Sequence, residues 1–100
     1  MRAALIGFDP GLGTFGAAAV DATTGAFIDN AVFISGKVSF AENDTVSSLM
    51  RAQSLWRKIQ DFLLPYDVKH MASEMLSQPQ SAGAATKIGI SFGVIAAHAA

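Results

Sequence analysis

The sequence contains no cysteine, which excludes a disulfide framework and a zinc site built on thiolates. This absence fits a reducing compartment, and we expect the protein in the cytoplasm. No cationic segment followed by an apolar core and a cleavage site stands near the N-terminus, so no signal peptide is predicted. The longest apolar run, residues 88–100, is too short to span a bilayer, so no membrane partner is expected.

Charged side chains are also scarce: they make up 15% of the residues, and the net charge is −1. Nucleic-acid-binding domains are usually basic, so this balance argues mildly against such a partner. By contrast, 51% of the residues are hydrophobic, which is a high share for a chain of this size. We expect residues 1–100 to form a single small domain.

The first segment with a clear pattern predicts a strand over residues 3–9. Its apolar run is too short for a typical helix, and Pro10, which has no N–H to donate, ends it. Gly11 and Gly13 permit the positive φ angles that a tight reversal needs. A second apolar run at residues 15–20 follows at once, so the two runs predict a β-hairpin.

Asp9 ends the first predicted strand, at the tip of this hairpin. Aspartate commonly makes local hydrogen bonds in turns, and such a structural role is one interpretation of this residue. The other interpretation is a metal-binding carboxylate held on rigid backbone. Taken alone, the position of Asp9 supports both equally.

A third strand is predicted over residues 26–35, after a turn at residues 21–25 that ends in glycine. Phe27, Ala31 and Phe33 are expected on one face of this strand, although other apolar residues interrupt strict alternation. Three strands in series, joined by short turns, form an antiparallel meander.

Residues 45–64 carry the clearest helical pattern, with apolar residues at spacings of three and four, and Pro65 ends the helix. The stripe is expected to contain Val46, Leu49, Met50, Trp56, Ile59 and Leu63, widened by Ala52, Leu55 and Phe62. Trp56 could stack on a nucleobase, but its place in the stripe favours core packing. Three basic residues lie on the opposite side of the helix from the stripe: Arg51, Arg57 and Lys58. They favour a solvent-exposed helix face over a phosphate-binding surface.

A fourth strand is predicted over residues 66–75, with Glu74 near its end. Because it follows a helix, we expect it to return parallel to the first strand and beside it, through a right-handed crossover. Glu74 then lies next to Asp9 at the same edge of the sheet. Two such carboxylates repel each other, and a shared hard divalent cation relieves that repulsion. The pair therefore shifts the interpretation of Asp9 toward a metal site.

A last helix is predicted from residue 77 to residue 100. Small residues recur in it every four positions, at Ser81, Ala85, Gly89, Gly93 and Ala97. Glycine in a helix costs about 1 kcal/mol relative to alanine, so this face indicates a close approach of two backbones. The approach could be to the rest of the domain or to a second subunit.

Several of these features, in this order, resemble a known family. They are the segment Gly7-Phe8-Asp9-Pro10-Gly11, Gly16, Glu74, Ser81, Lys87-Ile88-Gly89 and Gly93-Val94. Together they resemble the N-terminal two-thirds of the RuvC-type Holliday junction resolvases, which are ribonuclease-H-like nucleases. The resemblance implies an α/β fold of the ribonuclease-H-like class: a three-stranded antiparallel meander, a parallel fourth strand and two helices. The fifth strand and the final helix of the family would be missing from this chain.

The resemblance also implies a chemistry. Asp9 and Glu74 would be the first two of four catalytic, metal-binding acids, and they would hold Mg²⁺, or Mn²⁺ in its place, for two-metal hydrolysis of a phosphodiester. The implied partners are branched DNA, in the form of a four-way junction, and a second copy of the chain in a homodimer. Lower-ranked nucleic-acid contacts are expected at Gly11, Ser77, Ser81 and Lys87.

The sequence departs from that family because no Asp or Glu follows Glu74. We therefore expect a C-terminally truncated domain that is inactive alone. Two other functions remain open. The chain could be a noncatalytic nucleic-acid-binding or dimerisation module. A fragment of an actin-like ATPase is less favoured, because that phosphate loop normally has Thr or Ser after the glycine, whereas Leu12 and Gly13 precede Thr14 here.

Overall fold

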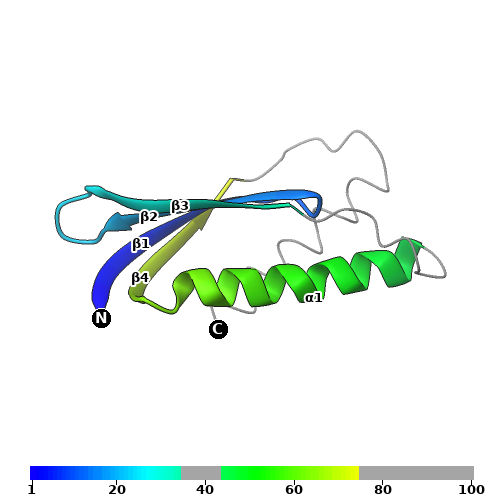
Figure 1. The fold of residues 1–100 in the computed structure, drawn as a ribbon. Coiled ribbons are helices and arrows are strands. Elements are labelled where there is room, and N and C mark those ends of the chain that lie inside the picture. Colours follow the sequence, from blue (N-terminus) through cyan, green and yellow to red (C-terminus); the bar gives the residue numbers. More distant parts are fainter. Residues whose placement is uncertain (35–43, 75–100) are drawn as a thin grey trace.

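A computed structural model gives the structure of residues 1–34 and 44–74. In chain order its elements are β1 (Arg2–Asp9), β2 (Thr14–Asp21), β3 (Phe27–Ile34), α1 (Asp44–Leu63) and β4 (Tyr66–Ser73) (Figure 1). The four predicted strands and the helix predicted over residues 45–64 are all present, close to their expected bounds. The helix predicted over residues 77–100 lies outside the described residues.

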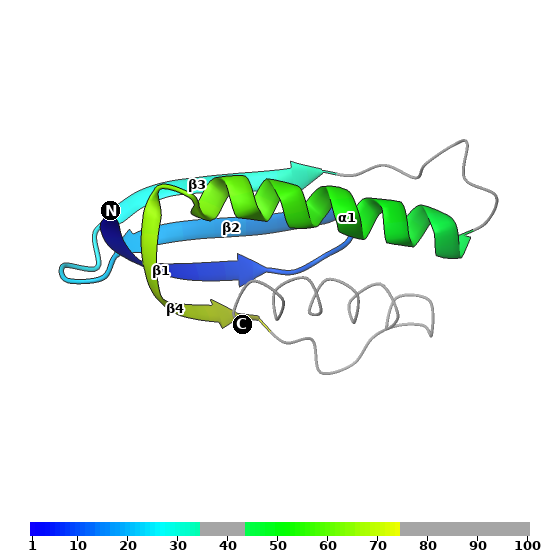
Figure 2. The ribbon, with the colours of Figure 1, turned by 90° about the horizontal axis from the view of Figure 1, so that it is seen from below.

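The strands form one mixed sheet in the order β3-β2-β1-β4. β1 is antiparallel to β2, β2 is antiparallel to β3, and β4 is parallel to β1, as Figure 2 shows. The antiparallel meander and the parallel return of the fourth strand beside the first are thereby confirmed. Within the described part of the chain, β3 and β4 are the edge strands.

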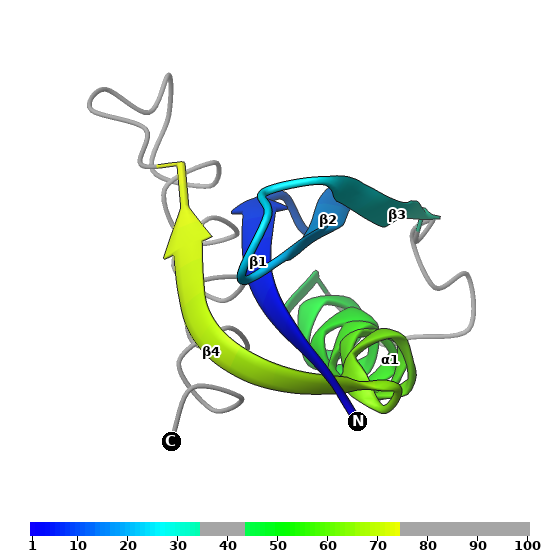
Figure 3. The same ribbon diagram turned by 90° about the vertical axis from the view of Figure 1, so that its left-hand side faces the viewer.

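Helix α1 covers one face of the sheet, and the core lies between the two layers (Figure 2, Figure 3). Side chains alternate along a strand, so every second residue of β1 and β2 faces the helix. The buried core consists of Ala4, Ile6, Phe8, Phe15, Ala17, Ala19, Leu55 and Ile59. Aromatic rings pack side by side across the sheet, with centroid distances of 5.5 Å for Phe8–Phe15 and 6.3 Å for Phe15–Phe33. Phe33 in turn contacts Phe62 of α1 at a centroid distance of 6.3 Å and so connects the two layers. Among the described residues, α1 is the one helix that packs on the sheet, and the other face carries no described element.

The buried face of α1 is narrower than the predicted stripe. Five of its predicted members are confirmed: Leu55 and Ile59 are buried, and Ala52, Phe62 and Leu63 pack against the core. Trp56, expected in the core, has 39% of its surface exposed, and Leu49 has 61%. Apolar residues extend around this helix beyond the width of one face, so their spacing does not determine which of two neighbouring stripes contacts the sheet. In residues 1–34 and 44–74, no helix has the length and apolar character needed to cross a membrane.

The inner face of β3 is set by an irregularity in its pairing with β2. Two consecutive residues of β2 pair with Asp29 and Phe27, which leaves Ile28 as an extra residue between the two pairs. An extra residue of this kind disturbs the alternation of side chains along the strand. Ile28 and Phe33 therefore pack against the core, whereas Phe27, which was expected on the same face as Ala31 and Phe33, is 66% exposed.

The turn between β2 and β3 is built around the Asp21 carboxylate. The backbone N–H groups of Thr23 and Thr24 donate to its Oδ1 atom at 2.9 and 3.0 Å, and Nε of Arg2 lies 3.1 Å from its Oδ2 atom. Gly25 has a φ of +72°, which glycine adopts without strain. The N–H groups of Thr24 and Thr23, and then the Arg2 guanidinium, lower the pKa of Asp21 from its ordinary value of 3.8 to about 2.

This lowered pKa predicts a pH-dependent contribution to stability. Because the folded state binds the proton of Asp21 more weakly than the unfolded state, the contribution is fully present above pH 3.8 and is lost as the pH falls toward about 2. We expect Asp21→Asn to be less stable than the wild type above pH 3.8. The difference in stability should shrink as the pH falls toward about 2. Urea unfolding at several pH values measures this.

Asp61→Asn is the matched control for the loss of one surface charge, because Asp61 is exposed and its carboxylate has no partner among the described residues. If the stability difference between the wild type and Asp21→Asn stays constant across the acid range, the role given to Asp21 is wrong.

Candidate metal centre

Asp9 is placed by the end of β1 and the turn that follows it. Pro10 cannot donate a ladder hydrogen bond, and β1 ends at Asp9, as predicted. Gly11 and Gly13 permit positive φ angles, but neither residue adopts one. Position 11 requires glycine for a steric reason, because a Cβ atom there would clash with the carbonyl oxygen of Thr14.

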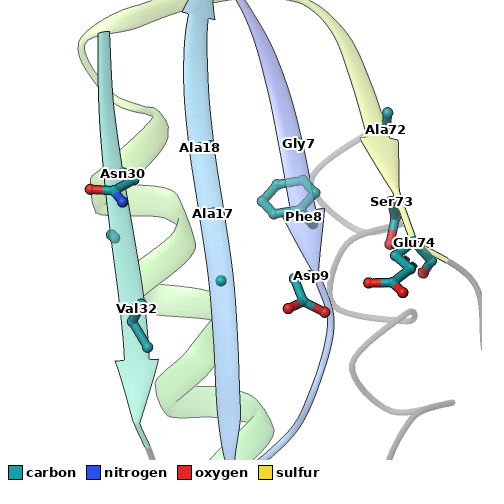
Figure 4. A pocket seen from close by; sticks show the side chains of 12 residues that line it. Gly7, Phe8, Asp9, Ala17, Ala18, Asn30, Val32, Ala72, Ser73 and Glu74 are labelled. Carbon is teal, nitrogen blue, oxygen red and sulfur yellow. Dashed lines mark hydrogen bonds between the residues drawn. The ribbon is translucent and has the colours of Figure 1, made fainter. Parts of the chain in front are cut away.

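Glu74 directly follows β4 and lies beside the end of β1. Its backbone N–H donates to the carbonyl oxygen of Phe8 at 3.1 Å, next to the parallel pairing of Phe8 with Ser73. Because Phe8 is buried against the helix, Asp9 faces the opposite side of the sheet. Figure 4 shows the carboxylates of Asp9 and Glu74 turned toward the same space. The structure thus brings together the two residues that the sequence analysis singled out.

Neither carboxylate has a protein partner in the described part of the chain. Asp9 and Glu74 are exposed, and neither side chain makes a hydrogen bond or an ion pair with residues 1–34 or 44–74. Neighbouring carboxylates repel each other, and a cation between them relieves the repulsion. Mg²⁺ binds through one or two carboxylates and keeps several waters, so this pair of oxygen donors fits it. Among the described residues, no group of three or more metal-binding side chains occurs.

An open hollow of about 590 Å³ adjoins the two carboxylates (Figure 4). Of its described lining residues, Asp9 and Glu74 lie at the β1 and β4 side, and Asn30 and Val32 lie on β3. Small residues line the space between them: Gly7, Gly16, Ala18 and Ala72. The sequence analysis did not identify Asn30, because its position opposite β1 depends on the shifted register of β3, which no residue pattern revealed.

The residues predicted to contact nucleic acid are only partly described. Gly11 lies in the turn after β1, and the other three lie outside the described residues; they are Ser77, Ser81 and Lys87. The basic residue Lys58 of α1 contacts the end of β3, where its Nζ donates to the carbonyl oxygen of Ile34 at 3.4 Å. No basic side chain from the described ranges lines the hollow.

The mixed sheet in the order β3-β2-β1-β4, with α1 on one face, is a ribonuclease-H-like fold. One solved structure that shares it is T. thermophilus RuvC in complex with Holliday junction substrate, with a TM-score of 0.78 and 15% identity, covering 98% of this chain and 58% of that chain. Another is the Thermus thermophilus RuvC structure, with a TM-score of 0.73 and 18% identity, covering 96% of this chain and 57% of that chain. A scan against protein-family models and a search of curated proteins found no match.

These structures confirm the resemblance to RuvC at the level of the fold. The chain spans less than two-thirds of the length of the RuvC chains that it matches. Because one fold can host many functions, the function of this chain rests on the chemistry of its own residues.

Proposed function

We propose that this chain is the metal-binding part of a nuclease that hydrolyses phosphodiester bonds in four-way DNA junctions. The observation that carries the proposal is the pair of carboxylates, Asp9 and Glu74, which lie at the ends of two parallel strands and have no partner among residues 1–34 and 44–74. The RuvC structure with Holliday junction substrate supports this choice of substrate, because it shares the fold.

The residues of this chain have distinct roles in the proposal. Asp9 and Glu74 would hold Mg²⁺, or Mn²⁺ in its place, and ions bound there supply the Lewis acid that activates water and stabilises the leaving oxygen. The backbone of Phe8 sets the spacing of the two acids, because its carbonyl oxygen accepts the Glu74 N–H while its ring is buried. Gly16 keeps the approach to Asp9 clear, since a Cβ atom there would lie 3.4 Å from Cβ of Asp9. A homodimer in the cytoplasm would present one such site to each of two strands.

Titration with Mn²⁺ tests the metal site. The paramagnetic ion should broaden the backbone amide signals nearest the two acids, including that of Gly11, and should spare the β2–β3 turn. We expect weak binding, because the described part of the chain supplies two acidic ligands. Asp9→Asn and Glu74→Gln should each lower the affinity at least about tenfold, since even the outer-shell partners of metal ligands contribute that much.

Asp61→Asn is again the matched control, because it removes an exposed carboxylate from α1, outside the hollow. The proposed metal site is wrong if the broadening spares Gly11. It is also wrong if Asp9→Asn and Glu74→Gln bind Mn²⁺ as tightly as Asp61→Asn does.

A noncatalytic junction-binding or dimerisation module is a second candidate function. It is favoured by the finding that residues 1–34 and 44–74 contain no third acid near the pair. Such a module would bind a four-way junction equally well with and without a divalent ion, whereas the nuclease proposal predicts that Ca²⁺ strengthens binding through Asp9 and Glu74.

A further inference from the structure

The hollow beside the two acids extends across three strands toward Asn30. In the sheet register, Gly7 of β1 pairs with Ala18 of β2, and Ala18 pairs with Asn30 of β3. Adjacent strands lie about 4.8 Å apart, so Asn30 is about 10 Å from Gly7 across the sheet. Figure 4 shows Asn30 on the β3 side of this hollow and Asp9 on the other side. Asp9 lies two residues further along β1, in the row of Gly16 and Val32, so a ligand held at the acids reaches Asn30 by lying diagonally across β1 and β2.

The row has a floor of very small residues. A Cβ atom added at Gly7 would meet nothing within 4 Å, so packing against the described residues does not require glycine there. A larger side chain would instead project into the hollow. The neighbours of Gly7 on both sides, Ala72 of β4 and Ala18 of β2, are also small. The volume of about 590 Å³ is within the range of about 300–1,000 Å³ for small-molecule sites.

Asn30 is the polar side chain on the far wall of the hollow. It is exposed, and its carboxamide makes no hydrogen bond with the described residues; its backbone N–H donates to Oδ1 of Asp29 at 2.8 Å. A carboxamide offers both donors and an acceptor. This combination matches the edge of a nucleobase, such as that of adenine. The apolar floor suits a sugar and a base better than it suits a phosphate.

We propose that Asn30 is a specificity-determining residue, which hydrogen-bonds the base edge of a nucleotide next to the phosphodiester held at Asp9 and Glu74. The sugar and base of that nucleotide lie over Gly7 and Ala18. This inference rests on the proposed nuclease function, and it adds the part of the substrate that is read and the residue that reads it.

Binding of fluorescent four-way junctions in Ca²⁺, followed by anisotropy, tests the inference on the full chain. The junctions differ in the base at the positions next to the branch point. Asn30→Ala should lower the affinity for the preferred junction about threefold to tenfold, the range for one lost hydrogen bond, and should reduce the preference among bases. Gly7→Val should weaken binding to every junction, because its side chain fills the hollow.

Two matched controls separate these effects from general ones. Gln53→Ala removes an exposed carboxamide from α1, on the other side of the sheet, and Ala3→Val places the same valine side chain on β1 outside the hollow. Both should bind like the wild type. Circular dichroism establishes that each variant is folded before it is compared.

The outcomes distinguish this inference from the function on which it rests. Asn30→Ala should still bind Mn²⁺ at Asp9 and Glu74 as the wild type does. If it also keeps the wild-type affinity and base preference for junctions, the inference about Asn30 is overturned while the metal site stands. An equal loss of affinity for every junction would indicate a backbone contact and would overturn base reading. If the wild type binds neither Mn²⁺ at the acids nor junctions, the proposed function fails and the inference fails with it.

Discussion

Residues 1–100 alone are expected to bind a labelled four-way junction in Mg²⁺ and to leave it uncut. The described residues bring together one pair of acids, Asp9 and Glu74, and no Asp or Glu follows Glu74 in the sequence. Two-metal hydrolysis requires both ions to be held in position, and each missing ligand costs occupancy as well as geometry. Enzymes accelerate their reactions by about 10⁶-fold or more, so an incomplete site should reduce cleavage below detection.

The measurement is incubation of a junction labelled on each strand in turn, followed by separation of the products on a denaturing gel. Asp9→Asn is the informative control, because it removes one acid of the pair. Nicks that persist in Asp9→Asn come from a contaminating nuclease. Paired nicks that need a divalent ion and disappear in Asp9→Asn would contradict the expectation, and would indicate that a partner chain completes the site.

Phe15→Ala should have the largest effect on stability. Phe15 is fully buried, and its ring lies between those of Phe8 and Phe33, at centroid distances of 5.5 and 6.3 Å. Truncation of a buried phenylalanine costs about 3–5 kcal/mol, through lost apolar burial and the cavity that remains. A domain of this size has a total stability of about 5–15 kcal/mol. The variant should therefore be partly unfolded or close to unfolding at 25 °C.

Phe27→Ala is the matched control for Phe15→Ala, because Phe27 is the same residue type on the neighbouring strand and is 66% exposed. Urea unfolding of both variants measures the difference in their free energies of unfolding. The urea concentrations at the midpoints are compared with one common slope of free energy against urea concentration. Phe27→Ala should stay within about 0.5 kcal/mol of the wild type, as is usual for surface substitutions. Equal losses in the two variants would show that the core is not centred on Phe15.

Local chemistry made much of this fold predictable from the sequence. Pro10 ends β1 because it has no N–H, and Pro65 follows the helix and precedes β4. A helix between two strands predicts a parallel return, and that return placed Glu74 beside Asp9. The pair of acids could thus be predicted from two strand ends and one connection, without any knowledge of side-chain packing.

Other features could not be predicted, because they depend on contacts between elements. The extra residue at Ile28 exposes Phe27 and shifts the register in which β3 pairs with β2, yet nothing in the local sequence marks it. The exposure of Trp56 depends on the rotation of α1 about its own axis, which the sheet selects. Gly11 was correctly placed in a turn, but its cause is the nearby carbonyl oxygen of Thr14 and not its φ angle.

The hydrogen bond from the Glu74 N–H to the Phe8 carbonyl oxygen has an evolutionary consequence. The two acids are aligned by main-chain pairing, which every residue except proline can make. Mutations can therefore replace most side chains of β1 and β4 without separating the acids, provided that the inner face stays apolar. A lineage with this arrangement can diverge until sequence comparison no longer detects it. Its geometry would persist, and only a comparison of structures would reveal the common ancestry.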